Sequence, residues 1–193
     1  MEGSKALEAL RIVKLKAAVP LHLVSKLIEE RQKKYQELLA DPDYTDVAFN
    51  PDTGGLKATH IGHSFDRLKG WYEKQVQEVG YNNGNEVIFG NELFGESGQR
   101  FTEGTWNGKQ FEIAAAESGT SSNIIKALNH CASKVETKIA VIFFPNEGYN
   151  MEEFVRGIAR YKGIKKNSPN NYVEFDTIIG ITIQGEIKIP SKD

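Results

Sequence analysis

The sequence predicts a mixed α/β fold that begins with a helical arm, and three observations support this prediction. Apolar residues recur at helical spacing over residues 21–40, which is typical of an amphipathic helix. Asn107-Gly108 lies between two short apolar segments, a pattern that predicts a β-hairpin with a two-residue turn. The run 138–144 is almost continuously apolar, as expected for a strand that is buried on both faces.

The first 68 residues are expected to precede the core. Helices are predicted over 4–17 and 21–40, on either side of Pro20, and together they form a helical arm of residues 1–40. Eight Lys and Arg residues against five acids give this arm a charge of +3, so it is either a solvated helix pair or a surface for a partner or nucleic acid. Residues 41–68 are rich in Asp, Asn, Pro and Gly, which predicts a long irregular segment that carries two histidines.

Residues 69–193 are expected to form the α/β core. Its predicted elements are a helix, three strands, a helix, a strand, a helix and a final strand pair, at 69–79, 85–89, 101–106, 110–115, 121–133, 138–144, 151–161 and 179–189. Ser121 or Ser122 is expected to cap one helix and Asn150 another, because short polar side chains accept hydrogen bonds from the first backbone N–H groups of a helix.

Length and composition limit the class of protein. The 193 residues fit one domain, or one domain with an appendage, and 39% hydrophobic and 26% charged residues are typical of a globular protein in water. Cys131 is the only cysteine, which excludes an internal disulfide. No segment approaches the roughly 20 apolar residues of a membrane-spanning helix, and Lys and Glu interrupt every apolar run near the N-terminus, so no signal-peptide core is expected there. These observations predict no membrane association and a cytoplasmic site of action.

Three glutamates form the candidate catalytic group. Glu73 lies in a predicted helix, and Glu103 and Glu112 lie on the two strands of the predicted hairpin. Carboxylate oxygens are the preferred ligands of hard divalent cations such as Mg²⁺, and such a cation activates water and stabilises a phosphodiester transition state. The alternative is that Glu103 and Glu112 are ordinary exposed strand residues, because a one-residue slip in register places them on opposite faces.

The order of these elements resembles the PD-(D/E)xK nuclease superfamily over about residues 69–145. Within it, the chain is similar to the C-terminal nuclease domains of contact-dependent inhibition toxins and to toxin domains attached to phage head-morphogenesis proteins. The segments that carry this resemblance are Gly70–Glu73, Thr102–Gly108, Phe111–Ala114 and Asn123–Lys134.

This resemblance implies a restriction-endonuclease-like mixed sheet that is flanked by helices. It also implies that Glu73, Glu103 and Glu112 bind a divalent metal, with Mg²⁺ as the expected ion. The activity it implies is cleavage of RNA such as tRNA, in preference to DNA. A cognate immunity protein is the partner that it implies.

One residue departs from the family motif. The Lys of the Asp/Glu-x-Lys element falls on Ala114, although this Lys normally offsets the negative charge that develops in phosphoryl chemistry. Lys109 or Lys126 is expected to supply the charge instead, unless Lys126 is only an exposed helical residue. The alternative is a phage-related interaction module without activity, which the net charge of −2 also favours.

His60 and His63 suggest a different chemistry. Two imidazoles can share acid and base roles in metal-free RNA cleavage, so the alternative enzyme is a ribonuclease similar to the barnase–EndoU–colicin–RelE group. Thr120 and Ser121 precede or begin a helix whose N-terminus either binds a substrate phosphate or is simply capped. Trp106 is expected either to stack on a base or to lie in the core.

Overall fold

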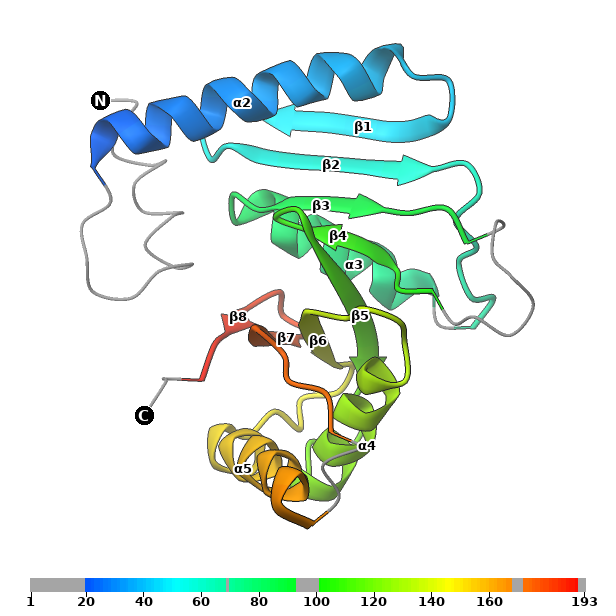
Figure 1. Ribbon diagram of the computed structural model, residues 1–193, viewed down its shortest axis with the longest axis vertical. Coiled ribbons are helices and arrows are strands. Elements are labelled where there is room, and N and C mark those ends of the chain that lie inside the picture. Colours follow the sequence, from blue (N-terminus) through cyan, green and yellow to red (C-terminus); the bar gives the residue numbers. More distant parts are fainter. Residues whose placement is uncertain (1–19, 69, 93–100, 168–171, 191–193) are drawn as a thin grey trace. The chain divides into compact units, whose positions relative to one another are not determined.

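The computed structural model describes residues 20–68, 70–92, 101–167 and 172–190. Within these residues it contains four helices and eight strands (Figure 1), so the predicted mixed α/β class is confirmed. The chain divides into two compact units, residues 1–93 with 104–108 and residues 94–103 with 109–193. The helix expected over 4–17 lies outside the described residues.

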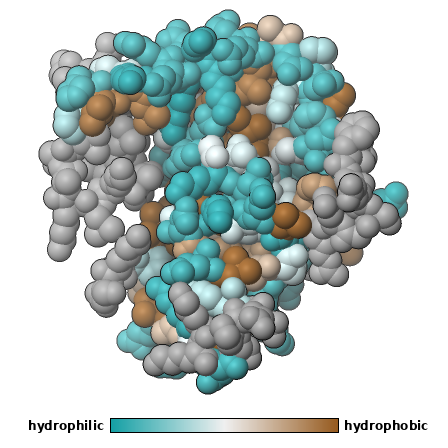
Figure 2. Space-filling model, viewed as in Figure 1, coloured by the Kyte–Doolittle hydropathy of each residue, from teal (hydrophilic) through white to brown (hydrophobic). Residues whose placement is uncertain are grey.

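The N-terminal unit contains two helices and four strands. Their bounds are α2 (Leu21–Ala40), β1 (Tyr44–Asn50), β2 (Gly55–His60), α3 (Gly70–Asn82), β3 (Glu86–Phe89) and β4 (Gly104–Trp106). Strand β1 pairs antiparallel with β2, β2 pairs parallel with β3, and β3 pairs antiparallel with β4. Helix α2 confirms the expectation for residues 21–40, and Figure 2 shows a mainly hydrophilic surface over it, as expected for an amphipathic helix.

Side chains along β2 and β3 alternate between the two faces of the sheet of this unit, and both faces are apolar. Leu56 and Ile88 pack with Leu38 of α2 in one buried cluster. Val87 lies on the other face, where Gly80 of α3 is so close that a Cβ there would collide with it. Because successive side chains of a strand point to opposite faces, α2 and α3 cover opposite sides of the sheet.

The irregular segment expected over 41–68 is wrong between Tyr44 and His60, because β1 and β2 form an antiparallel hairpin there. Some of the turn-forming residues that suggested a long loop, Asp41-Pro42-Asp43, precede β1, and others form the connection between the two strands. Asn50 Oδ1 accepts hydrogen bonds from the backbone N–H groups of Asp52 and Thr53, and Gly54 has a φ of 74°. Dense turn signals therefore marked a hairpin connection and masked the short strands beside it.

The C-terminal unit contains two helices and four strands. Their bounds are β5 (Lys109–Ala115), α4 (Ser121–Ala132), β6 (Ile139–Phe144), α5 (Met151–Asn167), β7 (Thr177–Thr182) and β8 (Ile187–Lys188). Strands β5, β6 and β7 run parallel in that order, and β8 pairs antiparallel with β7. Every residue of β6 is buried, which confirms the expectation from its apolar sequence. Helices α4 and α5 pack in one core cluster with Ala140, Ile142 and Phe144 of β6.

Two local predictions are confirmed at the backbone. Asn107 and Gly108 have φ values of 50° and 77°, and two successive positive φ values are the signature of a type I′ turn. Asn150 Oδ1 accepts the backbone N–H of Glu153 at 3.0 Å, so Asn150 caps α5 as expected.

The cap of α4 differs from the prediction by one position. Thr120 has the extended backbone that an N-cap requires, and its hydroxyl accepts the backbone N–H of Asn123 at 3.4 Å. Neither Ser121 nor Ser122 is the cap, because both already lie within the helix. A run of similar hydroxyl residues does not reveal which of them leaves the helical conformation.

Arg31 joins α2 to three connections of the N-terminal unit. It is 6% exposed, and its guanidinium donates hydrogen bonds to the carbonyl oxygens of Gly54 and Gly84 and to Asn107 Oδ1. Each of these residues lies in a turn beside a strand, so a single side chain stabilises several chain reversals at once.

We predict that Arg31→Met lowers the free energy of unfolding by about 2–4 kcal/mol, because three buried acceptors lose a charged donor. Urea denaturation checks this, with Lys33→Met as the matched control, since Lys33 lies on the same helix with its side chain 82% exposed. Equal unfolding midpoints for the two variants would contradict the prediction.

Candidate active site

One histidine and two glutamates meet near the end of β3 in the N-terminal unit. His63 follows β2, Glu73 lies in the first turn of α3, and Glu92 follows β3. His63 Nδ1 is 3.2 Å from Glu92 Oε1, and His63 Nε2 is 3.8 Å from Glu73 Oε2. The imidazole therefore lies between two carboxylates that come from different elements.

Aromatic packing and backbone bonds fix the position of His63. Its ring stacks on Phe89 with 4.4 Å between centroids and an interplanar angle of 5°, and it meets the ring of Phe65 edge-on at 4.6 Å. The side chain is 0% exposed. The backbone N–H of Glu92 also donates to the carbonyl oxygen of Gly62 at 3.2 Å. These contacts hold the loop after β2 against the loop after β3.

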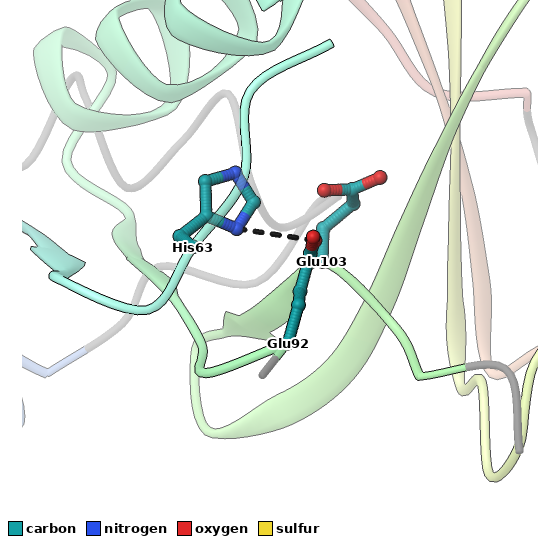
Figure 3. A group of neighbouring side chains, drawn as sticks. All are labelled: His63, Glu92 and Glu103. Carbon is teal, nitrogen blue, oxygen red and sulfur yellow. Dashed lines mark ion pairs between the residues drawn. The ribbon is translucent and has the colours of Figure 1, made fainter. Parts of the chain in front are cut away.

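Glu103 reaches the same place because of the register between β3 and β4. It directly precedes Gly104, and Gly104 pairs with Phe89 at the end of β3. Gly104 has a φ of 151°, and a Cβ there would overlap the carbonyl oxygen of Ile88, so only glycine permits this approach. His63, Glu92 and Glu103 each offer one ligand atom, and these atoms lie within 4.8 Å of one another. Figure 3 shows the imidazole and the two carboxylates gathered at one point.

The residues at this site fit a divalent cation. Two carboxylate oxygens and one imidazole nitrogen form a ligand set that suits Mn²⁺ or Zn²⁺. Mg²⁺ prefers sites with fewer nitrogen ligands. Ligand atoms on opposite sides of such an ion lie about 4–4.4 Å apart, so the observed spacing needs only a small side-chain movement. Glu73 Oε2 is buried and accepts no hydrogen bond from the residues that the structure describes. The His63 Nε2 atom, 3.8 Å away, lies beyond hydrogen-bond distance of this oxygen.

Sequence reasoning found part of this group. Glu73, Glu103 and His63 were all candidates, whereas Glu92 was missed. Its flanking sequence carries no motif, and its position immediately beyond a buried strand is the only signal that pointed to it. His60 has a different environment from His63, because its Nδ1 accepts the backbone N–H of Gly62 and its ring packs edge-on against another aromatic side chain.

Glu112 forms a second cluster, within the C-terminal unit. Its side chain is 0% exposed in β5, and its Oε1 lies 3.0 Å from His130 Nε2 and 3.1 Å from Lys134 Nζ. Lys134 Nζ also donates to the carbonyl oxygen of Phe101 at 3.1 Å. Glu112 Oε2 has no hydrogen-bond partner in the part of the chain that the structure describes. One carboxylate oxygen is thus held by two cationic or polar groups, and the other is buried without a hydrogen-bond partner among the described residues.

Lys134, two residues beyond α4, places an ammonium group beside Glu112. Ala114 occupies the motif position and is buried in the cluster of β6, α4 and α5, where an ammonium group would be costly. Of the two lysines expected to replace it, Lys109 forms an ion pair with Asp176 and Lys126 is exposed on α4. Sequence reasoning missed Lys134 because it follows the helix by two residues and approaches β5 only in the folded chain.

The remaining predicted substrate contacts have internal partners. The backbone N–H of Ser121 donates to Glu153 Oε2 at 2.7 Å, so a carboxylate of the chain already lies at the α4 N-terminus, which Thr120 caps. This hydrogen bond is the main reason that the pKa of Glu153 is lowered. Trp106 is 2% exposed, which agrees with the expectation that it lies in the core.

Cys131 lies behind Glu112. Its Sγ is 3.6 Å from the carbonyl oxygen of Glu112, and burial raises the pKa of the thiol well above its usual value, with a further increase from the Glu112 charge. The thiolate is the reactive form of cysteine. Cys131 is therefore protected from modification in two ways, because reagents have limited access to it and because its thiol stays protonated.

We predict that iodoacetamide at mildly alkaline pH modifies Cys131 at least about a hundredfold more slowly in the folded protein than in urea. Mass spectrometry over time checks this, and Glu112→Gln should lower the pKa of the thiol and so raise the folded-state rate. Equal rates in the folded and unfolded chain would contradict the burial of the cluster.

Comparisons with known proteins give one structural similarity. No family model matches the sequence, and a search of curated proteins finds no match. A solved structure described as a "CdiA-CT/CdiI toxin and immunity complex from Burkholderia pseudomallei" is similar, with 19% identity and a TM-score of 0.44 over 64% of this chain and 84% of that chain. Among the described helices, none is both long and apolar enough to cross a membrane.

Proposed function

We propose that this chain is a toxin-type nuclease that cleaves phosphodiester bonds in RNA such as tRNA with the help of a divalent metal. The observation that carries the proposal is the group of His63, Glu92 and Glu103, whose ligand atoms lie within 4.8 Å of one another. The resemblance of residues 69–145 to PD-(D/E)xK toxin nucleases supports the same assignment, because it independently selects Glu73 and Glu103.

The chemistry follows from this ligand set. A divalent cation held there lowers the pKa of a water molecule and offsets charge on the phosphoryl group. His63, Glu92 and Glu103 would hold that cation, and Glu73 would either add a ligand through its Oε2 or orient the imidazole. The stacking of His63 on Phe89 keeps the site ordered before substrate binds.

The Glu112 cluster supplies fixed positive charge in this proposal. Lys134 is held by Glu112 and by the carbonyl oxygen of Phe101, so its ammonium group is oriented before any substrate arrives. It takes the role that the motif assigns to a strand lysine, which is to offset negative charge in the transition state. Glu112, expected as a metal ligand, orients Lys134 through Oε1 and keeps Oε2 for a ligand.

An immunity protein belongs to the same proposal. A nuclease that acts on cytoplasmic RNA would harm the cell that makes it, so a tight inhibitor must be present there. The toxin resemblance of the sequence supports such a partner.

We predict that the protein binds Mn²⁺ and that Glu92→Gln/Glu103→Gln weakens this binding by at least about tenfold, because two anionic ligands are lost. Titration calorimetry with Mn²⁺ measures the affinity. The matched control is Glu30→Gln/Glu37→Gln, which removes the same charge from exposed positions of α2. The metal assignment fails if the two double variants bind Mn²⁺ equally.

We also predict that the protein cleaves tRNA when Mg²⁺ or Mn²⁺ is present and that EDTA abolishes cleavage. Glu103→Gln should reduce the rate about a hundredfold or more, since several kcal/mol of transition-state stabilisation are lost. Lys134→Met should reduce the rate at least about tenfold, whereas Lys126→Met should leave it nearly unchanged. Gel assays with tRNA and, separately, plasmid DNA measure all four proteins.

Each other outcome of this assay has a definite meaning. Cleavage that survives EDTA and is lost in His60→Ala would replace the proposal with a metal-free ribonuclease of the barnase–EndoU–colicin–RelE type. Cleavage of plasmid DNA alone would change the substrate. If neither substrate is cleaved under any of these conditions, an inactive interaction module becomes the better description.

A further inference from the structure

Helix α5 concentrates positive charge in a chain that is otherwise acidic. Between residues 156 and 166 it contains five cationic residues and no acid, namely Arg156, Arg160, Lys162, Lys165 and Lys166. The whole chain has a net charge of −2, so the remainder carries −7. A polyanion is therefore attracted more strongly to this part of α5 than the negative net charge of the chain would allow.

Three of these cationic side chains lie on the solvent side of α5. Phe154, Ile158 and Tyr161 are buried in the core of the C-terminal unit, whereas Arg156, Arg160 and Lys162 are exposed. These three residues define the cationic face. Arg156 and Arg160 are four residues apart and so are neighbours along the helix surface.

Small residues make the helix accessible between these charges. Ala159 is exposed, and a Cβ added at Gly163 would meet no atom within 4 Å. No bulky side chain therefore separates the helix backbone from a ligand at these two positions. A long, narrow polyanion can lie along such a surface with its charges close to the flanking cations.

Glu153 and Ser121 are the polar partners of the two arginines. Glu153 Oε1 pairs with Arg156 Nη1, while Glu153 Oε2 accepts the backbone N–H of Ser121. Arg160 Nη1 lies 3.3 Å from Ser121 Oγ. Arg160 thus contacts the N-terminus of α4 directly, and Arg156 is linked to it through Glu153. Ordering these side chains beforehand reduces the entropy that binding must remove.

We propose that the cationic face of α5 binds the phosphodiester backbone of tRNA. This inference rests on the proposed function, because an RNA nuclease with a net charge of −2 needs a local cationic surface to hold its substrate. The face provides affinity and orientation and takes no part in bond cleavage. Lys and Arg contacts to phosphates release counterions, so this binding weakens steeply as salt rises.

The test measures binding of fluorescein-labelled tRNA in EDTA by fluorescence anisotropy at several salt concentrations. The variant Arg160→Glu/Lys162→Glu should bind at least about tenfold more weakly, with a salt dependence that is shallower by about 0.7–0.9 logarithmic units for each phosphate that is no longer neutralised. The matched control is Lys26→Glu/Lys33→Glu, which makes the same charge change at exposed positions of α2. It should bind nearly as the wild type does, and circular dichroism should show that both variants remain folded.

Equal weakening by the two double variants would overturn the proposal, because net charge alone would then account for binding. Unchanged binding by the α5 variant would overturn it as well. If the α5 variant binds duplex DNA more weakly but binds tRNA as the wild type does, the choice of RNA is overturned.

Cleavage assays on the wild-type protein keep the two proposals separate. If tRNA binding depends on α5 but no cleavage occurs, the binding surface is supported and the nuclease proposal is contradicted. If cleavage is metal-dependent but the α5 variant binds tRNA as the wild type does, the nuclease proposal is supported and the binding surface is contradicted.

Discussion

The candidate metal site depends on the close pairing of Gly104 with Phe89 at the end of β3. A side chain at Gly104 would overlap the neighbouring strand, so this glycine brings Glu103 to the end of the sheet. Phe89 in turn stacks on His63, and the loop that follows it carries Glu92. One short stretch of antiparallel pairing therefore positions a residue from each of three loops, and no residue of the site has to bridge a long flexible connection.

Both clusters contain buried carboxylates, which lower stability unless partners compensate for them. Glu73 and Glu112 are each nearly or fully buried, and each keeps one oxygen that accepts no hydrogen bond within the described chain. A packed apolar pair would be more stable at either position. Retaining such groups favours a role in ligand binding over one in folding. Arg31 differs from them, because each of its hydrogen bonds joins elements of the fold.

Charge in this chain is distributed between separate tasks. Acidic residues gather where a cation is proposed to bind, and cationic residues gather on α5. The carboxylate of Glu153 lies at the N-terminus of α4 and accepts the backbone N–H of Ser121. The same carboxylate ties Arg156 in place. Glu153 thus connects the N-terminus of α4, where a substrate contact was expected, to the cationic face of α5.

Elements that local chemistry controls could be predicted from the order of the residues alone. The turn at Asn107-Gly108, the buried strand β6 and most of the helices follow from propensity, capping and apolar spacing, and none of these needs tertiary contacts. The folded chain was needed to show that turn-rich residues 41–68 contain two strands, and that Glu92 and Lys134 complete the two clusters. These outcomes depend on strand register and on contacts between residues far apart in the chain, and a one-residue shift in register would have separated them.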